Sequence, residues 1–440
     1  MIYENVLKDP DSFDFTIKQL GESSRPSPVS GRSFVSDDER IAFSSQVVNI
    51  LNQINTCSTF PSFEKAGPRK TIFHNPDTTK AAIITCGGLC PGLNNVIKGI
   101  VTVLHNEYNV QDIAGIRYGY KGLTNKSSHA PIPLSISNVE IIDEQGGTFL
   151  GSSRGNQDPG EMVDQLVQQS INILFCIGGD GTLSGAKAIA DEIERHNLPI
   201  SVIGIPKTID NDLNFIEKTF GFETSVQIAT QIIECAHVEA EGAENGVGIV
   251  KLMGRDSGFI AANASLAAAG VDFCLIPETP FNLEGPKGLF QALEQRLINN
   301  QHAVIVVAEG AGQDLFKDAK QQKDQSGNIL KEDIGVFLKD SIQSHFSKTG
   351  HDVSLKYLDP SYHIRSVPAN STDAIFCYLL AEHAVHAGMA GKTDLVIGHW
   401  NNFFTNVPIS LATSERRAVD LDGALWNGVL SATRQDALLD

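Results

Sequence analysis

Short apolar runs alternate with helical stretches along most of this chain, and this alternation most limits the folds that it can adopt. Runs that are apolar throughout, when helices separate them, are typical of parallel sheets covered on both faces. The sequence therefore predicts the α/β class. The predicted strands are AAIIT (81–85), INILFCI (171–177), ISVIGI (200–205), GVGIVKLM (246–253), DFCLI (272–276), HAVIVVA (302–308) and DLVIG (394–398). Helices are predicted at 92–108, 159–169, 182–196, 222–240, 257–270 and 371–388.

Composition limits the partners and the compartment. The 440 residues give room for two or three domains, and 52 acidic against 34 basic residues make the net charge −18. Such a charge argues against nucleic acid and against an anionic membrane surface as partners. The seven cysteines are scattered and predict no disulfide framework. The chain shows no opening signal-like stretch and no apolar run near the ~20 residues that span a bilayer, so we expect a cytoplasmic protein.

The first 80 residues follow a different pattern. They are rich in Ser, Pro and charge, although RIAFSSQVVNILNQI (40–54) predicts one amphipathic helix. We interpret residues 1–80 as an N-terminal extension whose role the sequence does not reveal.

Three loops that follow predicted strands have unusual compositions. They are TCGGLCPGLNN (85–95), GGDGTLSGA (178–186) and PKTIDND (206–212). Ligands of parallel sheets bind beyond the carboxyl ends of the strands, and glycine pairs there expose backbone N–H groups beside the positive end of the next helix. The loops therefore predict a phosphate site, although tight turns alone would explain one of them. A P-loop and a dinucleotide fold are both unsupported, because neither GxxxxGK[ST] nor GxGxxG follows the first strand.

The acidic residues in these loops suit phosphoryl chemistry. Asp180 can hold a Mg²⁺ ion that bridges phosphate oxygens, while Gly179 and Gly181 let the phosphates come close. If TIDND leaves its strand extended, Asp210 and Asp212 face the same side. One carboxylate can then take a proton from a substrate hydroxyl, and the other orients it or the waters of the metal.

Basic and hydroxyl groups precede these aspartates. Lys207 and Thr208 can donate hydrogen bonds to the phosphoryl group during transfer. An ordinary polar turn at the end of a strand is the alternative interpretation of this segment.

Five motifs occur in a fixed order: GGDGT, PKTIDND, MGRDSGF (253–259), IPETPF (276–281) and AEGAGQ (308–313). Together they resemble the 6-phosphofructokinase family. The resemblance covers about residues 80 to 410 and implies two Rossmann-like, three-layer α/β/α domains with mainly parallel sheets and an active-site cleft between them. It assigns residues 81–222 plus 364–415 to the phosphoryl donor and 223–363 plus 416–440 to the sugar, and it implies a homodimer or homotetramer.

The resemblance implies transfer of the γ-phosphoryl group of MgATP to the C1 hydroxyl of fructose 6-phosphate, a step of glycolysis that yields fructose 1,6-bisphosphate. Asp210 is implied as the general base, and Asp180 as the Mg²⁺ ligand with Asp212 supporting it. Loss of Asp210 should then lower kcat far more than it changes KM. The groups implied to stabilise the transferred phosphoryl are Gly87, Lys207, Thr208 and Arg255, and those implied to bind the nucleotide are Gly87, Arg154, Gly179, Asp180, Gly181 and Thr182.

The sugar site is implied to come from the second half of the chain. Glu309 would accept hydrogen bonds from sugar hydroxyls, and the backbone of Met253 and Gly254 would cradle the substrate. An arginine suits the 6-phosphate because its planar fork matches phosphate oxygens, with a surface ion pair as the alternative. The implied phosphate ligands are Lys356, Tyr362 and Arg365 in KYLDPSYHIR.

Two positions depart from the common patterns of the family. Bacterial-type members place an arginine, which reaches a neighbouring subunit, seven positions before the MGR methionine, where this chain has Gly246. At the positions of residues 181 and 207, ATP users generally have glycine twice, whereas pyrophosphate users have Asp and Lys. This chain is mixed, with Gly181 and Lys207. A carboxylate at 181 would crowd the α-phosphate of ATP, so ATP is the predicted donor and pyrophosphate the alternative. The mixed pair resembles the plant and trypanosome type.

Two further alternatives belong to other classes of protein. A kinase of NAD or lipids could carry GGDGT, but it would leave PKTIDND and MGRDSGF unexplained. A non-catalytic regulatory subunit would be expected to have lost its base or its metal ligand, whereas Asp180, Asp210, Asp212 and Arg255 are all present.

Overall fold

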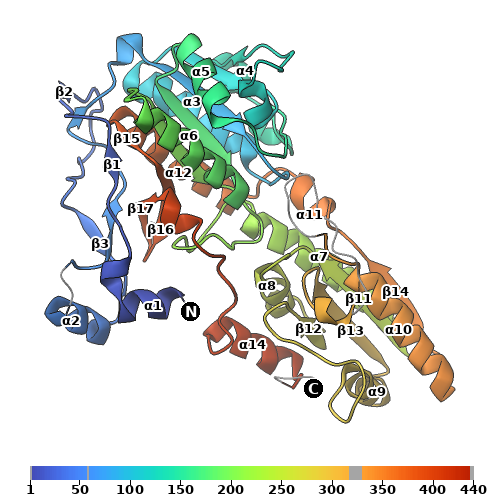
Figure 1. Ribbon diagram of the computed structural model, residues 1–440. Helices are drawn as coiled ribbons and strands as arrows, with labels where there is room; N and C mark the ends of the chain where they lie inside the picture. Colours follow the sequence, from blue (N-terminus) through green and yellow to red (C-terminus); the bar gives the residue numbers. More distant parts are fainter. Residues whose placement is uncertain (1, 57–58, 317–329, 437–440) are drawn as a thin grey trace. The chain divides into compact units, whose positions relative to one another are not determined.

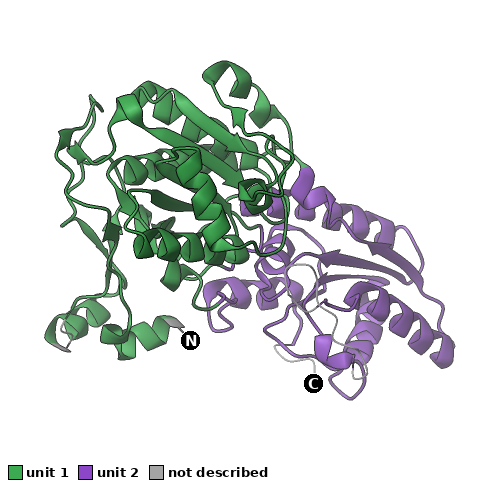
Figure 2. Cartoon of the chain, turned by 45° about the horizontal axis from the view of Figure 1, so that its top comes forward, with its two compact units in different colours: residues 1–208, 213–221, 367–415 green, residues 209–212, 222–366, 416–440 purple. Residues whose placement is uncertain are grey.

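The chain divides into two compact units in the computed structural model, which describes residues 2–56, 59–316 and 330–436 (Figure 1). Unit 1 consists of residues 1–208, 213–221 and 367–415, and unit 2 of residues 209–212, 222–366 and 416–440 (Figure 2). The chain therefore crosses from unit 1 to unit 2 within the PKTIDND motif.

Unit 1 is built on one large sheet, with nine strands among the described residues. The five strands at its centre, from β16 to β7 in the order below, are parallel. The strands beyond them on both sides run antiparallel to their neighbours. In spatial order the strands are β3 (Arg40–Ala42), β4 (Ser62–Lys65), β17 (Phe403–Pro408), β16 (Leu395–Trp400), β10 (Ser201–Pro206), β9 (Ile173–Gly178), β6 (Lys80–Thr85), β7 (Asp112–Ile116) and β8 (Ile132–Pro133).

Helices cover both faces of this sheet. A Cβ atom on Gly388 of α12 would meet Ile203 of β10, whereas one on Gly204 of β10 would meet Leu183 of α6. Adjacent residues of a strand face opposite sides, so α12 and α6 pack on opposite faces. The α-helices of unit 1 are α1 (Ile2–Lys8), α2 (Val47–Thr56), α3 (Leu93–Tyr108), α4 (Ile136–Val139), α5 (Pro159–Gln168), α6 (Asp180–Arg195), α12 (Ser371–Met389) and α13 (Ile409–Ala412). Short 3-10 helices are η1 (Pro10–Ser12), η2 (Pro76–Thr78), η3 (Gly119–Leu123) and η4 (Ile142–Glu144).

The N-terminal segment is part of unit 1. Its strands β3 and β4 extend the large sheet, and two short ribbons pair β1 (Lys18–Gln19) with β15 (Lys392–Thr393) and β2 (Arg25–Pro26) with β5 (Thr71–Ile72). The helix predicted over 40–54 is wrong in its first half, because residues 40–42 form β3 by pairing with β4, and the helix α2 begins at Val47. Pairing with a strand twenty residues away overrode the local periodicity.

Unit 2 contains a parallel four-stranded sheet in the order β12, β13, β11, β14. Val247 and Ile249 of β11 share a buried core with Leu293 and Leu338, which belong to α9 and α10. Gly248, between them, faces Ala236 of α7 on the other side. The elements are α7 (Phe222–Glu241), β11 (Gly246–Leu252), α8 (Phe259–Ala267), β12 (Phe273–Leu275), α9 (Leu289–Asn300), β13 (His302–Ala308), η5 (Gln313–Leu315), α10 (Ile334–Thr349), β14 (Ser354–Leu358), α11 (His363–Ser366) and α14 (Ala424–Thr433).

The predicted α/β class with mainly parallel sheets is confirmed. Six cysteines lie in the part of the chain that the structure covers, and no disulfide joins them; Cys57 is outside that part. Within the same residues, no helix combines the length and the apolar character that crossing a membrane requires.

Candidate active site

Three loops, two of which carry glycine pairs, meet at one edge of the large sheet in unit 1. They follow β6, β9 and β10, which are neighbours in the sheet. Thr85 is in register with Ile177, and Pro206 with Gly178, so the three strands end at the same level. The structure thus brings together the loops that the sequence singled out.

Gly87 lies in the loop that follows β6. Its φ of +84° lies in the left-handed region, where a side chain is strained. Its backbone N–H donates to the carbonyl of Ser153 over 3.0 Å, and its carbonyl accepts from Ser152 Oγ over 2.6 Å. A Cβ atom at this position would lie 3.2 Å from Lys207 Nζ and 4.0 Å from Thr182 Oγ1. Gly87, Thr182 and Lys207 therefore converge on one small region.

Lys207 brings a positive charge to this region while it is almost fully buried, with 5% of the residue exposed. Its Nζ donates to the carbonyl of Gly88 over 2.7 Å, and its backbone N–H donates to Gly178 over 3.1 Å. The next residue, Thr208, accepts a hydrogen bond from Thr219 Oγ1 at its carbonyl. A buried ammonium group beside glycine loops provides the local positive charge that an anionic ligand of this acidic protein needs.

The GGDGT segment forms the amino end of α6. Gly179 caps this helix, and Asp180 lies in its first turn. A Cβ atom on Gly179 would lie 3.2 Å from the carbonyl of Lys207, whereas one on Gly181 would meet no atom of the described chain within 4 Å. The space beside Gly181 is therefore open to a ligand.

The donor set around Asp180 fits Mg²⁺ and no metal that needs several protein ligands. No group of three or more His, Cys, Asp or Glu side chains within the described residues could hold a metal ion. Mg²⁺ is usually bound through one or two carboxylates together with substrate phosphates and water, which one aspartate at a helix N-terminus satisfies.

Arg154 is exposed on the loop that also carries Ser152 and Ser153.

A second cluster, in unit 2, is made of acids. Asp210 and Asp212 lie in the segment 209–212, and Asp212 is 5% exposed. Asp212 Oδ2 is 3.0 Å from Arg416 Nη1, and the same nitrogen is 2.9 Å from Asp256 Oδ2. The carbonyl of Asp210 accepts a hydrogen bond from Ser257 Oγ over 3.2 Å.

The surroundings of Asp210 raise the pKa of its carboxyl. Burial of the carboxyl is the largest cause that raises its pKa well above the usual range, and the nearby charges of Asp212, Glu309 and Asp256 raise it further. Arg416 acts in the opposite direction. A carboxylate whose pKa moves toward neutrality is a stronger base, which suits proton abstraction from an alcohol.

Two strand ends of unit 2 bring further predicted residues together. The N–H of Glu309 donates to Leu252 over 2.9 Å, and the N–H of Gly310 donates to Gly254 over 3.0 Å. The loop at Met253 and Gly254 therefore runs beside Glu309. Burial raises the pKa of Glu309, and the charges of Arg255, Lys251 and Arg365 oppose that rise.

The three residues predicted to bind the 6-phosphate have different surroundings. Lys356 is half-buried in β14, in register with Gly248 of β11. Tyr362 is 75% exposed, and the guanidinium carbon of Arg365 lies 4.8 Å from the centre of its ring. The positive charge of Arg365 also acts to lower the pKa of Glu309.

Sequence reasoning missed three charged residues of unit 2. Arg416 and Asp256 contact each other, and Lys251 Nζ lies 3.0 Å from Asp333 Oδ2 and 2.9 Å from Asp359 Oδ2. Asp256 stands inside the MGRDSGF motif, so the motif was a signal for it. Arg416 stands in a polar stretch, SERRAVD, with no recognisable pattern.

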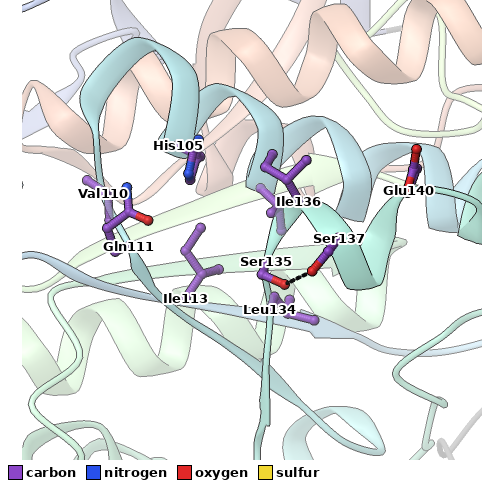
Figure 3. A pocket seen from close by; sticks show the side chains of 10 residues that line it. His105, Val110, Gln111, Ile113, Leu134, Ser135, Ile136, Ser137 and Glu140 are labelled. Atoms are coloured by element: carbon purple, nitrogen blue, oxygen red, sulfur yellow. Dashed lines mark hydrogen bonds between the residues drawn. The ribbon is translucent and has the colours of Figure 1, made fainter.

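A separate pocket of about 490 Å³ in unit 1 contains none of the predicted residues (Figure 3). Gln111 lies there at the amino end of β7, whereas the glycine loops follow the carboxyl ends of the parallel strands. Ser135 Oγ and Ser137 Oγ in its lining are 3.0 Å apart, and Gln111 Nε2 donates to Asn109 Oδ1. The pocket therefore does not belong to the predicted site.

Glycine turns at strand ends suit the close approach of phosphates, and carboxylates can hold Mg²⁺ or accept a proton, which are the functions that phosphoryl transfer needs. A family model described as phosphofructokinase matches residues 80–388. The ATP-dependent 6-phosphofructokinase of Borreliella burgdorferi is 47% identical over 440 residues, which cover 97% of each chain. The chain belongs to the phosphofructokinase family.

Two more comparisons agree with this membership. The ATP-dependent 6-phosphofructokinase of Trypanosoma brucei brucei is 48% identical over 373 residues, covering 84% of this chain and 76% of the relative. The crystal structure of a pyrophosphate-dependent phosphofructokinase from Marinobacter aquaeolei matches with a TM-score of 0.66 and 22% identity, covering 81% of this chain and 91% of that one. The second match concerns the fold alone.

Proposed function

We propose that this chain is an ATP-dependent 6-phosphofructokinase. It transfers the γ-phosphoryl group of MgATP to the C1 hydroxyl of fructose 6-phosphate and forms fructose 1,6-bisphosphate, a step of glycolysis. The observation that carries the proposal is the segment 207–212, which begins with a buried lysine beside two glycine loops and ends with two aspartates in an acid cluster. Relatives that bear the name are 45–48% identical to the chain.

Unit 1 would hold the phosphoryl donor. The backbone at Gly87, the hydroxyl of Thr182 and the ammonium of Lys207 converge, which suits phosphate oxygens. Asp180 would hold Mg²⁺, which neutralises charge on the phosphates when it is bound. Gly179, Gly181 and the exposed Arg154 complete the set proposed to bind the nucleotide.

Unit 2 would hold the acceptor and carry out the proton transfer. Asp210 takes the proton of the C1 hydroxyl, and the raised pKa of its carboxyl strengthens it as a base. Arg255 and Thr208 stabilise the transferred group, Met253 and Gly254 cradle the sugar, and Glu309 accepts hydrogen bonds from its hydroxyls. For the 6-phosphate we propose Lys356, Tyr362 and Arg365.

Pyrophosphate is the second candidate donor, because pyrophosphate users of the family generally have a lysine where this chain has Lys207. A cation beside the transferred group is compatible with either donor, whereas open space at Gly181 favours the larger nucleotide. We therefore place ATP first. The proposal also includes a homodimer or homotetramer that works in the cytoplasm.

A direct assay tests the proposed function. The purified full chain is given fructose 6-phosphate and Mg²⁺ with either ATP or pyrophosphate, and formation of fructose 1,6-bisphosphate is measured. We expect turnover with ATP at a kcat/KM at least about tenfold above that with pyrophosphate. Turnover with pyrophosphate alone would overturn the choice of donor, and no turnover with either would overturn the proposed function.

A further inference from the structure

Arg416 begins the C-terminal segment of unit 2 and lies between acids of two different loops. Its Nη1 atom is 3.0 Å from Asp212 Oδ2 and 2.9 Å from Asp256 Oδ2. The backbone N–H of Arg417 donates to the carbonyl of Asp212 over 2.8 Å. Two consecutive residues therefore hold both the side chain and the main chain of an aspartate that precedes Arg416 by 204 positions.

The partner acid, Asp256, connects this contact to the loop after β11. Asp256 also lies 3.5 Å from Lys331 Nζ and 3.9 Å from Arg255 Nε, through its two carboxylate oxygens. Ser257, the next residue, donates to the carbonyl of Asp210. The segment 209–212 is thus attached to the loop after β11 at two points, one through Ser257 and one through Arg416.

We infer that Arg416 is a positioning residue for phosphoryl transfer, which clamps Asp212 to Asp256 and so holds Asp210 in the orientation that proton abstraction requires. This inference rests on the proposed function. Arg416 does not act on the substrate in this scheme; it acts through Asp212 and Asp256.

Electrostatics explains why the segment needs a cation at this point. Asp212, Asp256 and Glu309 lie close enough to Asp210 to raise the pKa of its carboxyl, and like charges at short range repel. Without Arg416, the repulsion between Asp212 and Asp256 would push the two loops apart. A displacement of about 1 Å at a reacting group can lower the rate by roughly 100-fold.

Two substitutions at this position test the inference. Arg416→Ala should lower kcat by about 10- to 100-fold, while KM for fructose 6-phosphate and for ATP changes less than about threefold. Arg416→Lys should recover most of kcat. A single nitrogen of the arginine contacts both carboxylates, so the ammonium of a lysine can make the same bridge.

Arg296→Ala is the matched control. This arginine also belongs to unit 2, but its Nη2 donates to the carbonyl of Thr433 over 2.6 Å and its guanidinium lies over the ring of Phe273. We expect this variant to lose thermal stability and to retain kcat. A loss of kcat in Arg296→Ala that equals the loss in Arg416→Ala would show a general effect of removing an arginine, and would overturn the inference.

Hydrogen–deuterium exchange tests the clamp without using activity. The peptide that contains residues 209–213 should exchange faster in Arg416→Ala than in the wild type, and at nearly the wild-type rate in Arg416→Lys. Unchanged exchange in Arg416→Ala, or a wild-type kcat in that variant, would overturn the inference. An inactive wild type would refute the proposed function instead, and the exchange rates would still decide whether the clamp exists.

Discussion

The two clusters of candidate site residues are built from different materials. In unit 1 the cluster consists mainly of main chain, since glycine turns surround one buried ammonium group at Lys207. In unit 2 it consists of charged side chains, with Asp210, Asp212 and Asp256 near Arg416. The first cluster depends on the absence of side-chain atoms, whereas the second depends on a balance of charges.

This difference predicts which kind of substitution should damage each cluster. Adding atoms should damage the unit 1 cluster, because a Cβ at Gly87 would approach Lys207. Removing or neutralising a charged group should damage the unit 2 cluster, because its negative and positive side chains offset one another's charge. The predictions below test this contrast.

The largest effect is expected in unit 2, from neutralising the proposed base. Asp210→Asn should lower kcat by about 10²- to 10⁴-fold with little change in KM, because the proposed general base is lost. Thermal stability should rise in the same variant. The raised pKa means that the folded state disfavours the charged carboxylate, so stability falls as pH rises above the unfolded value, and an amide removes that penalty at neutral pH.

Steady-state kinetics and thermal unfolding measure both effects, with Asp340→Asn as the control. The side chain of Asp340 is 68% exposed on α10, so its loss should change neither quantity measurably. An Asp210→Asn enzyme that keeps more than about a tenth of the wild-type kcat would contradict the role of general base.

The next effect is expected in unit 1, from a single added carbon. Gly87→Ala should lower kcat/KM for ATP by about 10- to 100-fold, because the new Cβ lies 3.2 Å from Lys207 Nζ and displaces it. Gly147→Ala is the control, since its φ of +79° is similar and no described atom lies within 4 Å of the added carbon.

Both alanine variants should lose about 1–2 kcal/mol of stability from left-handed strain, and only Gly87→Ala should lose activity. Chemical denaturation and steady-state kinetics separate the two effects. Equal activity in the two variants would mean that crowding at Lys207 does not matter, and that the unit 1 cluster tolerates added atoms.

A smaller effect is expected from charge placed in the open space of unit 1. Gly181→Asp should raise KM for ATP by at least about tenfold, because a carboxylate beside the α-phosphate repels it. Gly181→Asn adds a side chain of nearly the same size without the charge, so it should raise KM for ATP less. Unchanged ATP kinetics in Gly181→Asp would show that the nucleotide does not lie near residue 181.

The smallest effect is a shift of the pH profile. Protonated Asp210 cannot act as a base, so kcat should rise with pH through a value above that of an ordinary aspartate. Asp212→Asn removes a charge that raises the pKa of Asp210, so the acidic limb should move to lower pH by about one unit or less. The position of the limb, rather than the maximal rate, is the measurement; a shift to higher pH would contradict the proposed coupling.

Much of the fold could be predicted because its signals are local. The strand at 302–308 has the predicted bounds, and α3 and α12 differ from the predicted bounds by one residue. Strands that are short or at an edge were missed, β3 and β8 among them, because pairing with a neighbour stabilises them more than their own composition does.

The candidate site shows the same division. The glycine loops and Asp210 with Asp212 are contiguous motifs, so residue types at fixed spacing were enough to single them out. The extended course assumed for TIDND is wrong, because Asn211 between the two aspartates has a left-handed φ of +53°. Arg416 could not be found in this way, since nothing near it in the chain indicates an acid to pair with.

The sequence alone therefore determined the α/β class and singled out the loops at 85–95, 178–186 and 206–212, because hydrophobic periodicity and the composition of strand ends are local signals. Only the tertiary structure decided that Lys207 lies beside Gly87 and that Arg416 joins Asp212 to Asp256. Those contacts connect segments about 120 to 200 residues apart, and electrostatic interactions depend on distance in space rather than on separation along the chain.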